Sequence, residues 1–255
     1  MENKILVDSI YLHSFGGKEL LEYFIKSLKK RKLLNNILFF FDYRLNTEEN
    51  ILFNDCFFYK IKPRITSRSS AYKKYSKDFN TIVCLSNIPP PYKILNKKVF
   101  IYFHNLLIIQ GFSSGLYNSI LNKLKKLFIK RKNFSNYNWI VQTNYMKEQI
   151  ARSFLIKKTK IKVYPFFDID KIKKSNKNFK SSTINFLYPT SHLKHKNIKN
   201  LINAFRLSKF KNKKKINLYL TIDGDDISNE NKNLKFVEKF EKNELLTFYK
   251  KSHYL

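Results

Sequence analysis

Two stretches in the first half of the chain combine residue types that bind phosphates or sugar hydroxyls. Gly16 and Gly17 stand in a predicted turn, Ser14–Gly17, between an apolar run and an amphipathic run. Paired glycines let a ligand approach the backbone, and a following helix N-terminus offers free N–H groups to a phosphate. His104 comes directly after the apolar run Val99–Phe103, where its imidazole is placed to hydrogen-bond a hydroxyl group. An ordinary turn and a surface histidine are the structural alternatives.

A third stretch joins a predicted strand to a predicted helix. Thr190 and Ser191 supply hydroxyl groups, and Lys196 lies close to the start of the helix. A lysine, hydroxyl groups and helix N–H groups together form a cradle for a diphosphate. The alternative is a basic loop that faces solvent. The glycines of the chain form no G-x-G-x-x-G pattern, so the dinucleotide-binding fingerprint is absent.

Strands and helices alternate along the chain and position these stretches. Short apolar runs predict strands, and apolar residues at helical spacing predict helices. The predicted strands are Ile5–Ile10, Ile37–Phe41, Thr81–Leu85, Val99–Phe103, Trp139–Gln142, Ile161–Tyr164, Ile184–Tyr188, Ile216–Ile222 and Leu234–Val237. The predicted helices run from Leu20 to Leu28, Leu116–Lys130, Tyr145–Phe154, from Ile198 to Phe205 and Glu244–Lys251. This alternation indicates an α/β protein with parallel sheets covered on both faces.

The elements fall into two groups. Residues 167–182 are rich in Lys, Asn and Ser and have the composition of a linker. We therefore predict an N-terminal domain over residues 1–166 and a partial second domain over residues 183–255. Because ligands bind beyond the carboxyl ends of parallel strands, Gly16, Gly17, His104 and Lys196 are predicted to face one cleft.

The charge of the chain is strongly positive. Its 255 residues include 50 Lys and Arg against 19 Asp and Glu, a formal net charge of +31, and residues 1–222 hold 44 of the basic residues with only 12 acidic ones. Such a surface attracts polyanions, which include nucleic acid, anionic lipid and phosphorylated substrates. An AT-rich genome produces the same excess of Lys, Asn and Ile without any partner, so charge alone identifies no function.

Other features indicate a cytoplasmic protein. The apolar runs are far shorter than the roughly 18 residues that span a bilayer, and the first residues lack the pattern of a signal peptide. Cys56 and Cys84 lie in apolar stretches, which predicts buried free thiols and no metal site. The predicted helix Leu116–Lys130 has an apolar stripe surrounded by lysines, a pattern that suits either a core-facing helix or one that lies on an anionic membrane. The stripe consists of Leu116, Ile120, Leu121, Leu124, Leu127 and Phe128.

Taken in order, these segments resemble the large family of retaining glycosyltransferases with the B-type fold (family 4, or group 1). The similar segments are Gly16-Gly17, Tyr102–Asn105, Trp139–Lys147, Lys162–Asp168, Pro189–Asn197 with Asn200–Phe205, Leu218–Gly224 and Phe236–Tyr249. The resemblance implies two Rossmann-like domains, the first on the acceptor side and the second binding the donor nucleotide. It implies sugar transfer from a nucleotide diphosphate sugar to a glycan or lipid-linked acceptor with retention of configuration. Such enzymes serve bacterial cell-surface polysaccharide or lipopolysaccharide synthesis.

The resemblance also implies roles for the candidate residues. His104 faces the transferred sugar, Gly16 and Gly17 form the N-terminal glycine loop, and Lys196 binds the donor diphosphate. No metal and no cofactor is implied, because a lysine and helix N-termini stabilise the charge on the leaving diphosphate.

The sequence departs from the family pattern at two places. Thr190 and Ser191 stand where many members have Gly-Arg, so one phosphate-binding cation is missing. The family's P-S-x-x-E segment, with two glutamates spaced E-x7-E beside the donor sugar, would follow Leu255 and is not in the chain. We therefore expect a C-terminally truncated member with an incomplete second domain and little or no transfer by these residues alone.

Two other classes stay open at this point. One is a non-catalytic partner, or a gene fragment, of such an enzyme. The other is a basic nucleic-acid-binding protein, although the aromatic residues lie mainly within apolar strands and no RRM, KH or zinc-finger motif is present. Nucleic acid is therefore not the favoured partner. We expect a nucleotide sugar, a glycan or lipid-linked acceptor, and an anionic membrane surface contacted from its inner face.

Overall fold

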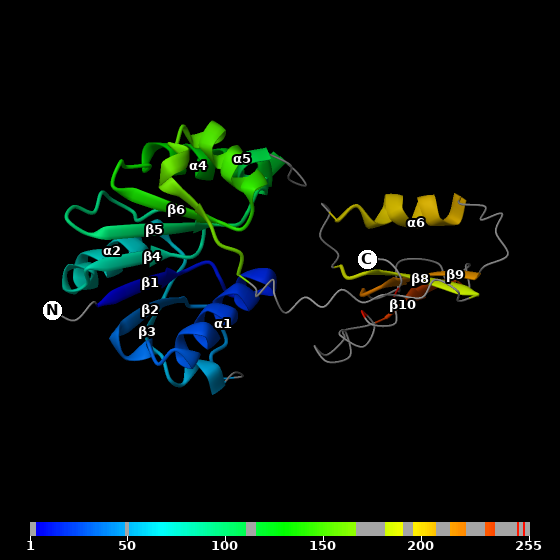
Figure 1. Ribbon diagram of the computed structural model, residues 1–255, viewed down its shortest axis with the longest axis horizontal. Helices are drawn as coiled ribbons and strands as arrows, with labels where there is room; N and C mark the ends of the chain where they lie inside the picture. The colour runs from blue at the N-terminus through cyan, green and yellow to red at the C-terminus, as the bar shows by residue number, and fades with distance from the viewer. Residues whose placement is uncertain are drawn as a thin grey trace. The chain divides into compact units, whose positions relative to one another are not determined.

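The structure is a computed structural model, and it describes residues 4–48, 51–110, 116–166, 182–190, 196–207, 215–222, 233–237, 249 and 252. The chain divides into two compact units, Met1–Ile172 and Lys173–Leu255 (Figure 1). Each unit has its own parallel sheet and its own hydrophobic core. The predicted linker, residues 167–182, lies outside the described residues except for Ser182.

The first unit is built on a parallel sheet of seven strands in the order β3-β2-β1-β4-β5-β6-β7. The strands are β1 (Ile5–Ser9), β2 (Ile37–Asp42), β3 (Phe57–Ile61), β4 (Thr81–Cys84), β5 (Lys98–Phe103), β6 (Tyr137–Val141) and β7 (Ile161–Val163). The chain adds β2 and β3 on one side of β1 and then returns to add β4 on the other side. The strand order therefore reverses between β1 and β4, and open α/β sheets bind their ligands at the carboxyl end of such a point.

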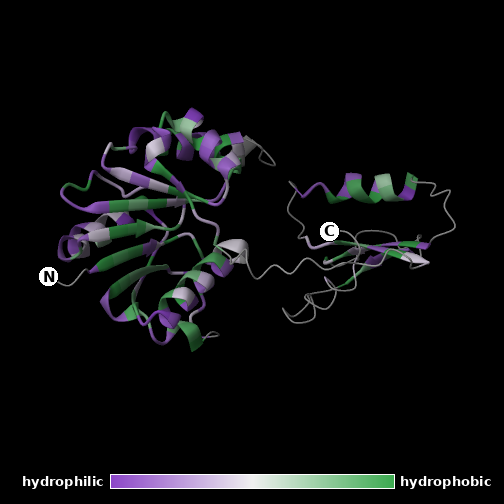
Figure 2. Cartoon of the chain, in the orientation of Figure 1, coloured by the Kyte–Doolittle hydropathy of each residue, from purple (hydrophilic) through white to green (hydrophobic). Residues whose placement is uncertain are grey.

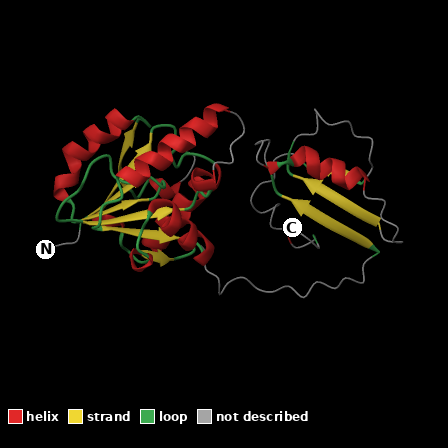
Figure 3. Cartoon of the chain, turned by 90° about the horizontal axis from the view of Figure 1, so that it is seen from above, coloured by secondary structure: helices red, strands yellow, loops and turns green. Residues whose placement is uncertain are grey.

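Helices cover both faces of this sheet (Figure 3). They are α1 (Phe15–Lys30), α2 (Ile65–Tyr75), α3 (Leu107–Gln110), α4 (Leu116–Arg131) and α5 (Asn144–Phe154). The core on the α1 face contains Val7 and Phe39, and the core on the α2 and α5 face contains Leu6 and Phe40. Neighbouring residues of one strand thus enter different cores, because successive side chains of a strand point to opposite faces.

Strand β2 illustrates why this sequence folds in this way. All six of its residues are buried, and Figure 2 shows the strands of the first unit as predominantly hydrophobic. Phe39 and Phe41 contribute to the α1 core, while Phe40 contributes to the opposite core. A strand covered on both faces has to be a continuous apolar run, and each buried phenylalanine stabilises the fold by about 1.5–3 kcal/mol.

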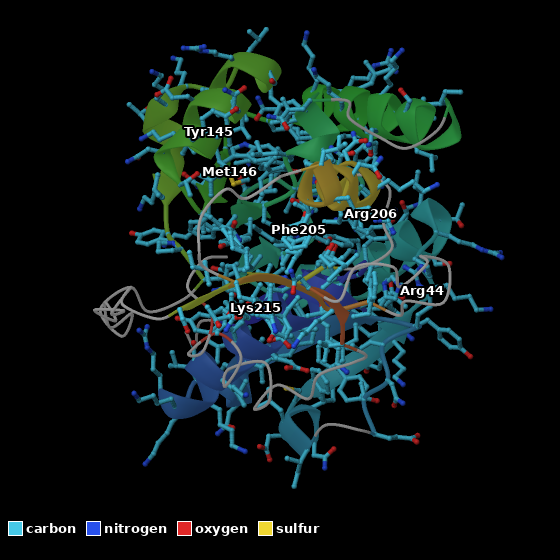
Figure 4. The ribbon with its side chains drawn as sticks, turned by 90° about the vertical axis from the view of Figure 1, so that its right-hand side faces the viewer. Arg44, Tyr145, Met146, Phe205, Arg206 and Lys215 are labelled. Carbon is cyan, nitrogen blue, oxygen red and sulfur yellow. The ribbon has the colours of Figure 1, made fainter. Side chains whose placement is uncertain are left out.

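Helix α5 begins at a cap that its sequence provides. The Oγ1 atom of Thr143 accepts a hydrogen bond of 3.2 Å from the backbone N–H of Met146. Figure 4 shows Tyr145 and Met146 in the first turn that follows this cap. Met146 is buried, whereas the Tyr145 side chain is 55% exposed. The start of α5 therefore lies within one residue of the predicted helix Tyr145–Phe154.

The second unit contains three parallel strands in the order β10-β9-β8 and one described helix. These elements are β8 (Thr183–Tyr188), α6 (Ile198–Leu207), β9 (Lys215–Leu220) and β10 (Leu234–Phe236). Helix α6 covers one face of the sheet (Figure 1), and Ile202 and Phe205 pack there with Leu218 and Leu220. The predicted helix Glu244–Lys251 lies, apart from Tyr249, outside the described residues.

The structure confirms the predicted α/β fold class and most of the predicted elements, with shifts of one or two residues at most of their ends. The largest shift is in α1, which begins at Phe15, five residues before the predicted start at Leu20. The structure adds β3, α2 and α3, which carry no regular apolar pattern. The predicted turn Ser14–Gly17 is wrong, because α1 begins at Phe15 and both glycines belong to its first turn. Ser14 is the extended residue that precedes the helix. The turn lies earlier in the chain, where the backbone N–H of Leu12 donates to the Ser9 carbonyl oxygen at 2.9 Å.

Cys56 and Cys84 are free and buried, as predicted. Burial raises the pKa of the Cys84 thiol to about 12 and that of Cys56 to about 11, so both remain uncharged at neutral pH. Across the described segments, no helix is long and apolar enough to span a bilayer.

Candidate functional site

Three buried polar atoms without a hydrogen-bond partner follow the neighbouring strands β1, β4 and β5. They are Nδ1 of His13, Oγ of Ser86 and Nδ1 of His104. The three strands are adjacent in the sheet, and adjacent parallel strands lie about 4.8 Å apart. A buried polar group left without a partner costs about 1–3 kcal/mol. Three such groups at one edge therefore indicate a place where a polar ligand supplies the missing partners.

The side chain of Asn87 fixes the position and the tautomer of His104. Its Oδ1 atom accepts hydrogen bonds from the backbone N–H groups of His104, at 2.7 Å, and Asn105, at 3.0 Å. This orientation places the Asn87 Nδ2 atom 3.4 Å from Nε2 of His104. Because an amide nitrogen only donates, Nε2 is the acceptor, and the proton of the neutral imidazole lies on Nδ1. The unpartnered Nδ1 atom is therefore a hydrogen-bond donor.

Burial lowers the pKa of His104 to about 4, so the imidazole is neutral at pH 7. A neutral ring with its proton on Nδ1 suits a hydrogen bond to a sugar hydroxyl or a phosphate oxygen. It does not suit the role of a cation. The structure thus places the predicted residue His104 at the expected strand end and defines which of its atoms is free to contact a ligand.

A buried ion pair lies beneath this edge of the sheet. Asp8 is completely buried in β1, and Arg68 of α2 is only 2% exposed. The Arg68 Nη2 and Nε atoms lie 2.7 Å and 2.8 Å from Oδ2 of Asp8, and the Tyr72 hydroxyl donates to the same oxygen at 2.8 Å. Burial opposes a charge on Arg68, but the Asp8 carboxylate raises its pKa above the ordinary value. Arg68 therefore remains charged in the core.

The same guanidinium holds the loop that carries Asn87. Arg68 Nη1 donates to the carbonyl oxygen of Pro89 at 2.8 Å, and Nη2 donates to that of Ile88 at 3.0 Å. These two residues directly follow Asn87, whose backbone has a φ of 69° in the left-handed region. Buried hydrogen bonds to a charged group fix this unusual conformation, and Asn87 in turn positions His104.

The loop after β1 is fixed in a similar way. Tyr11 has a φ of 85°, and its backbone N–H donates to Asp42 Oδ2 at 2.9 Å. Arg44, two residues after the end of β2, donates to both oxygens of the same carboxylate at 2.9 Å. Although burial opposes it, these hydrogen bonds lower the pKa of Asp42. The loop that leads to His13 is therefore anchored on β2.

Gly16 and Gly17 lie in the first turn of α1, beyond the same end of β1. Ser14 makes no capping hydrogen bond with its side chain, so the first N–H groups of α1 are not capped in that way. A Cβ atom added at Gly16 meets nothing within 4 Å, whereas one at Gly17 lies 3.2 Å from Cδ2 of Leu12. The space beside Gly16 is thus open for a ligand to approach the backbone.

The predicted diphosphate residues of the second unit flank the start of α6. Lys196 and Asn197 line a cavity of about 470 Å³ together with Asn200 of α6. The Lys196 carbonyl oxygen accepts a hydrogen bond of 3.0 Å from the Tyr188 hydroxyl, which fixes the backbone there. This geometry brings the lysine to the helix N-terminus, as the sequence predicts.

Thr190, which follows β8, is hydrogen-bonded to Thr221, which follows the neighbouring strand β9. Its backbone N–H donates to Thr221 Oγ1 at 2.7 Å, and the Thr221 hydroxyl donates to the Thr190 carbonyl oxygen at 3.0 Å. The predicted residue Ser191 lies outside the described residues. In the part of the chain that the structure describes, no three His, Cys, Asp or Glu residues form a group that holds a metal ion.

Sequence reasoning missed four residues of this site: His13, Ser86, Asn87 and Arg68. None belongs to a recognisable motif. The available signal was position, because Ser86 and Asn87 follow the predicted strand Thr81–Leu85 just as His104 follows its strand.

Neither a protein-family description nor a curated protein sequence matches the chain. Solved structures do. The lipopolysaccharide outer core galactosyltransferase WaaB, in its apo form, aligns with a TM-score of 0.57 and 10% identity over 98% of this chain and 71% of its own. Anabaena HepE aligns with a TM-score of 0.58 and 12% identity in complex with UDP-glucose, over 94% of this chain and 70% of its own. In complex with UDP and glucose it aligns with a TM-score of 0.55 and 14% identity, over the same shares. With its seven-stranded parallel sheet and its second, smaller α/β unit, the chain has the B-type glycosyltransferase fold.

Proposed function

We propose that the chain is a glycosyltransferase that moves a sugar from a nucleotide diphosphate sugar to a glycan or lipid-linked acceptor, with retention of configuration. The observation that carries this proposal is the polar edge of the first unit. His13, Ser86 and His104 supply three buried, unpartnered polar atoms beyond three adjacent strands. A polyhydroxylated sugar offers several donors and acceptors within a few ångströms, which is the chemistry such an edge requires.

The geometry of the residues supports the roles that we propose for them. The neutral His104 donates from Nδ1 to a hydroxyl group or phosphate oxygen, and Asn87 keeps the ring in that tautomer. The uncapped first turn of α1, with the open space beside Gly16, suits the close approach of an anionic or hydroxyl oxygen. None of these groups has to gain or lose a proton in order to bind the sugar.

In the second unit, Lys196 and the N-terminus of α6 bind the donor diphosphate. As the bond to the sugar breaks, negative charge grows on the diphosphate, and a fixed cation beside helix N–H groups stabilises that charge. The mutual hydrogen bonds of Thr190 and Thr221 hold the adjacent backbone in place. Support comes from HepE, a protein of the same fold that is solved with UDP and with UDP-glucose.

The acceptor and the setting are part of the same proposal. WaaB, another protein of this fold, is a lipopolysaccharide outer core galactosyltransferase. We assign this chain to cell-surface polysaccharide or lipopolysaccharide synthesis, at the inner face of an anionic membrane. Helix α4 supports this setting, because it carries no acidic residue and ends in Lys130 and Arg131.

The first test is nucleotide binding by the full chain, measured by calorimetry with UDP and UDP-glucose. Lys196→Gln should weaken both about tenfold, since a charged hydrogen bond contributes about 1.5–3 kcal/mol. Lys199→Gln is the matched control and should bind as the parent does, because Lys199 is exposed and follows Lys196 by three residues in the chain. Loss of affinity in both variants alike would point to general charge attraction instead of a diphosphate site.

The second test separates sugar recognition from nucleotide recognition. His104→Phe should leave the affinity for UDP unchanged and abolish the added affinity that UDP-glucose gains from its sugar. No binding of any nucleotide or nucleotide sugar by the parent chain would refute the proposed function.

A further inference from the structure

Helix α4 leaves part of its apolar stripe exposed. Ile120, Leu124 and Leu127 lie on one face of the helix and are 49%, 57% and 45% exposed. Among the α4 side chains that the structure describes, residues 119–131, Ile129 is the completely buried one, and it lies on a different side of the helix. The sequence left two interpretations of this stripe open, a core-facing helix and a helix that lies on an anionic membrane. The exposure of these described residues contradicts a face that is wholly packed into the core. Exposed apolar stripes of this kind mark surfaces that receive a partner.

The stripe forms one wall of a groove with a volume of about 690 Å³. Leu124 and Leu127 line it from α4, and Ile65, which is 65% exposed, lines it from the start of α2. Ile88 and Pro91 form a further part of the wall. These five lining residues are apolar, and the volume accommodates a hydrocarbon chain of roughly a dozen carbons or more.

The rim of the groove is cationic. Lys125, Arg131 and Lys132 line it. Helices α2 and α4, which form its walls, contain no Asp or Glu. Arg68 also reaches the groove, but its guanidinium is already paired with Asp8 in the core and does not act as a rim cation. An apolar channel with a positive rim complements an amphiphile that has one hydrocarbon chain and an anionic head.

The groove is connected to the candidate site through one short loop. Ile88 and Pro91 belong to the loop that begins with Asn87, and Asn87 holds His104. Tyr11, which lines the groove as well, belongs to the loop after β1 that leads to His13. A ligand chain in the groove is thereby placed next to the loops that carry the unpartnered polar atoms.

We propose that this groove binds the hydrocarbon chain of a phosphorylated lipid acceptor, with the phosphate on Lys125, Arg131 and Lys132. The assignment of this lipid as the acceptor rests on the proposed function. The groove narrows the chemical class of that acceptor to an anionic amphiphile. The occupant is a single lipid molecule; general adhesion to a bilayer surface is a different outcome of the test.

The experiment is a titration of the full chain with dodecyl phosphate, kept below the concentration at which it forms micelles. Dodecyl phosphate should bind, inorganic phosphate should show no measurable binding, and neutral dodecyl glucoside should bind at least about tenfold more weakly. Equal binding of the phosphate and the glucoside would overturn the proposed role of the rim. Binding of phosphatidylglycerol vesicles without binding of dodecyl phosphate would overturn the single-lipid site.

Variants locate the site. Leu124→Ser with Leu127→Ser should weaken dodecyl phosphate about tenfold or more, whereas Leu95→Ser, at a residue that is 61% exposed and does not line the groove, should have no effect. Lys125→Ser with Lys132→Ser should remove the preference for dodecyl phosphate over dodecyl glucoside. Lys157→Ser, at an exposed lysine, is the control for the loss of positive charge. Equal effects of the groove and control variants would overturn the assignment.

A parallel titration with UDP separates this proposal from the proposed function. Intact UDP binding with no dodecyl phosphate binding would reject the groove and leave the transferase proposal standing. Dodecyl phosphate binding in a chain that binds no nucleotide would uphold a lipid site and reject its role as an acceptor site.

Discussion

The Oδ1 atom of Asn87 lies 2.7 Å from the backbone nitrogen of His104, while the nitrogen of the same amide lies 3.4 Å from the His104 ring. One side chain thus fixes both the backbone and the protonation pattern of the histidine. Because the amide oxygen is occupied by two backbone N–H groups, the imidazole has a single neutral tautomer that satisfies Asn87.

Replacing Asn87 with aspartate should raise the pKa of His104. Aspartate still accepts the two backbone hydrogen bonds, but it places a carboxylate beside Nε2, which favours the protonated ring. The pKa should rise from about 4 to about 5–7. Titration of the imidazole proton by NMR measures it directly. Asn96→Asp is the control, because Asn96 is also an asparagine with positive φ, at 56°, and lies on the surface. An unchanged His104 titration in Asn87→Asp would contradict the tautomer assignment.

The buried histidine should also make stability depend on pH. The folded pKa of His104 is about 4, below the roughly 6.5 of an unfolded histidine. Between these two pKa values, His104 is protonated in the unfolded state and neutral in the folded state. The contribution of His104 to the free energy of unfolding is therefore fully present above about pH 6.5 and is lost as the pH falls towards 4. The loss amounts to up to about 3 kcal/mol.

Urea denaturation at several pH values should show this loss in the parent and a smaller one in His104→Gln. Other titrating groups are common to both proteins, so the difference between the two curves isolates His104. Parallel curves would show that the ring is accessible to protons in the folded state.

Removing the buried cation should destabilise the first unit more than almost any other substitution there. Arg68→Met leaves the Asp8 carboxylate without its charged partner, at a cost of about 3–5 kcal/mol. The double variant Asp8→Asn with Arg68→Met should recover a large part of that loss, because no charge is then left in the core. Arg44→Met is the comparison, since 48% of the Arg44 side chain is exposed and Asp42 keeps its bond from Tyr11. If Arg68→Met and Arg44→Met cost the same, the ion pair contributes little to the fold.

Substitution at Gly16 should separate stability from binding. Gly16→Ala meets no atom within 4 Å and should stabilise α1 by about 0.4–1 kcal/mol through the unfolded state. The added methyl group occupies the space through which a ligand approaches the first turn, so the affinity for UDP-glucose should fall. Thermal unfolding and calorimetry measure the two effects. A variant with unchanged ligand affinity would show that no ligand reaches Gly16.

The sequence predicted those elements well whose buried residues recur at a regular spacing. It predicted poorly the element that buries a charged side chain in the core. Helix α5 was predicted closely because Thr143 caps it and its apolar residues recur at helical spacing. Helix α2 was missed because its inward face carries Arg68, a residue that patterns assign to solvent. The partner that makes this burial possible is Asp8, sixty positions away in the chain, and no local pattern reveals it.

The candidate site was predictable only in part for the same reason. His104, Lys196 and Thr190 follow strands or precede a helix, and position alone identified them. Ser86 and Asn87 also follow a strand, but their roles depend on hydrogen bonds to β5 across the sheet, which a linear pattern does not record. The glycines were placed in a turn because Gly16-Gly17 disfavours helix, yet a first helical turn tolerates them.

The strand order of the first unit has a consequence for the way the chain reaches its native state. β1 pairs with β2 and with β4, so Ile5 meets both Ile37 and Thr81. Because β1 precedes both partners in the chain, one of its edges stays unpaired until β4 has been synthesised. Contacts of such long sequence separation slow folding, because the loops between them have to close first. Asp8 lies on β1, and its charged partner Arg68 comes from α2, which lies between β3 and β4 in the chain. We therefore expect the ion pair, the β1–β4 contact and the loop that carries Asn87 to form together, since each depends on the same residues of β1 and α2.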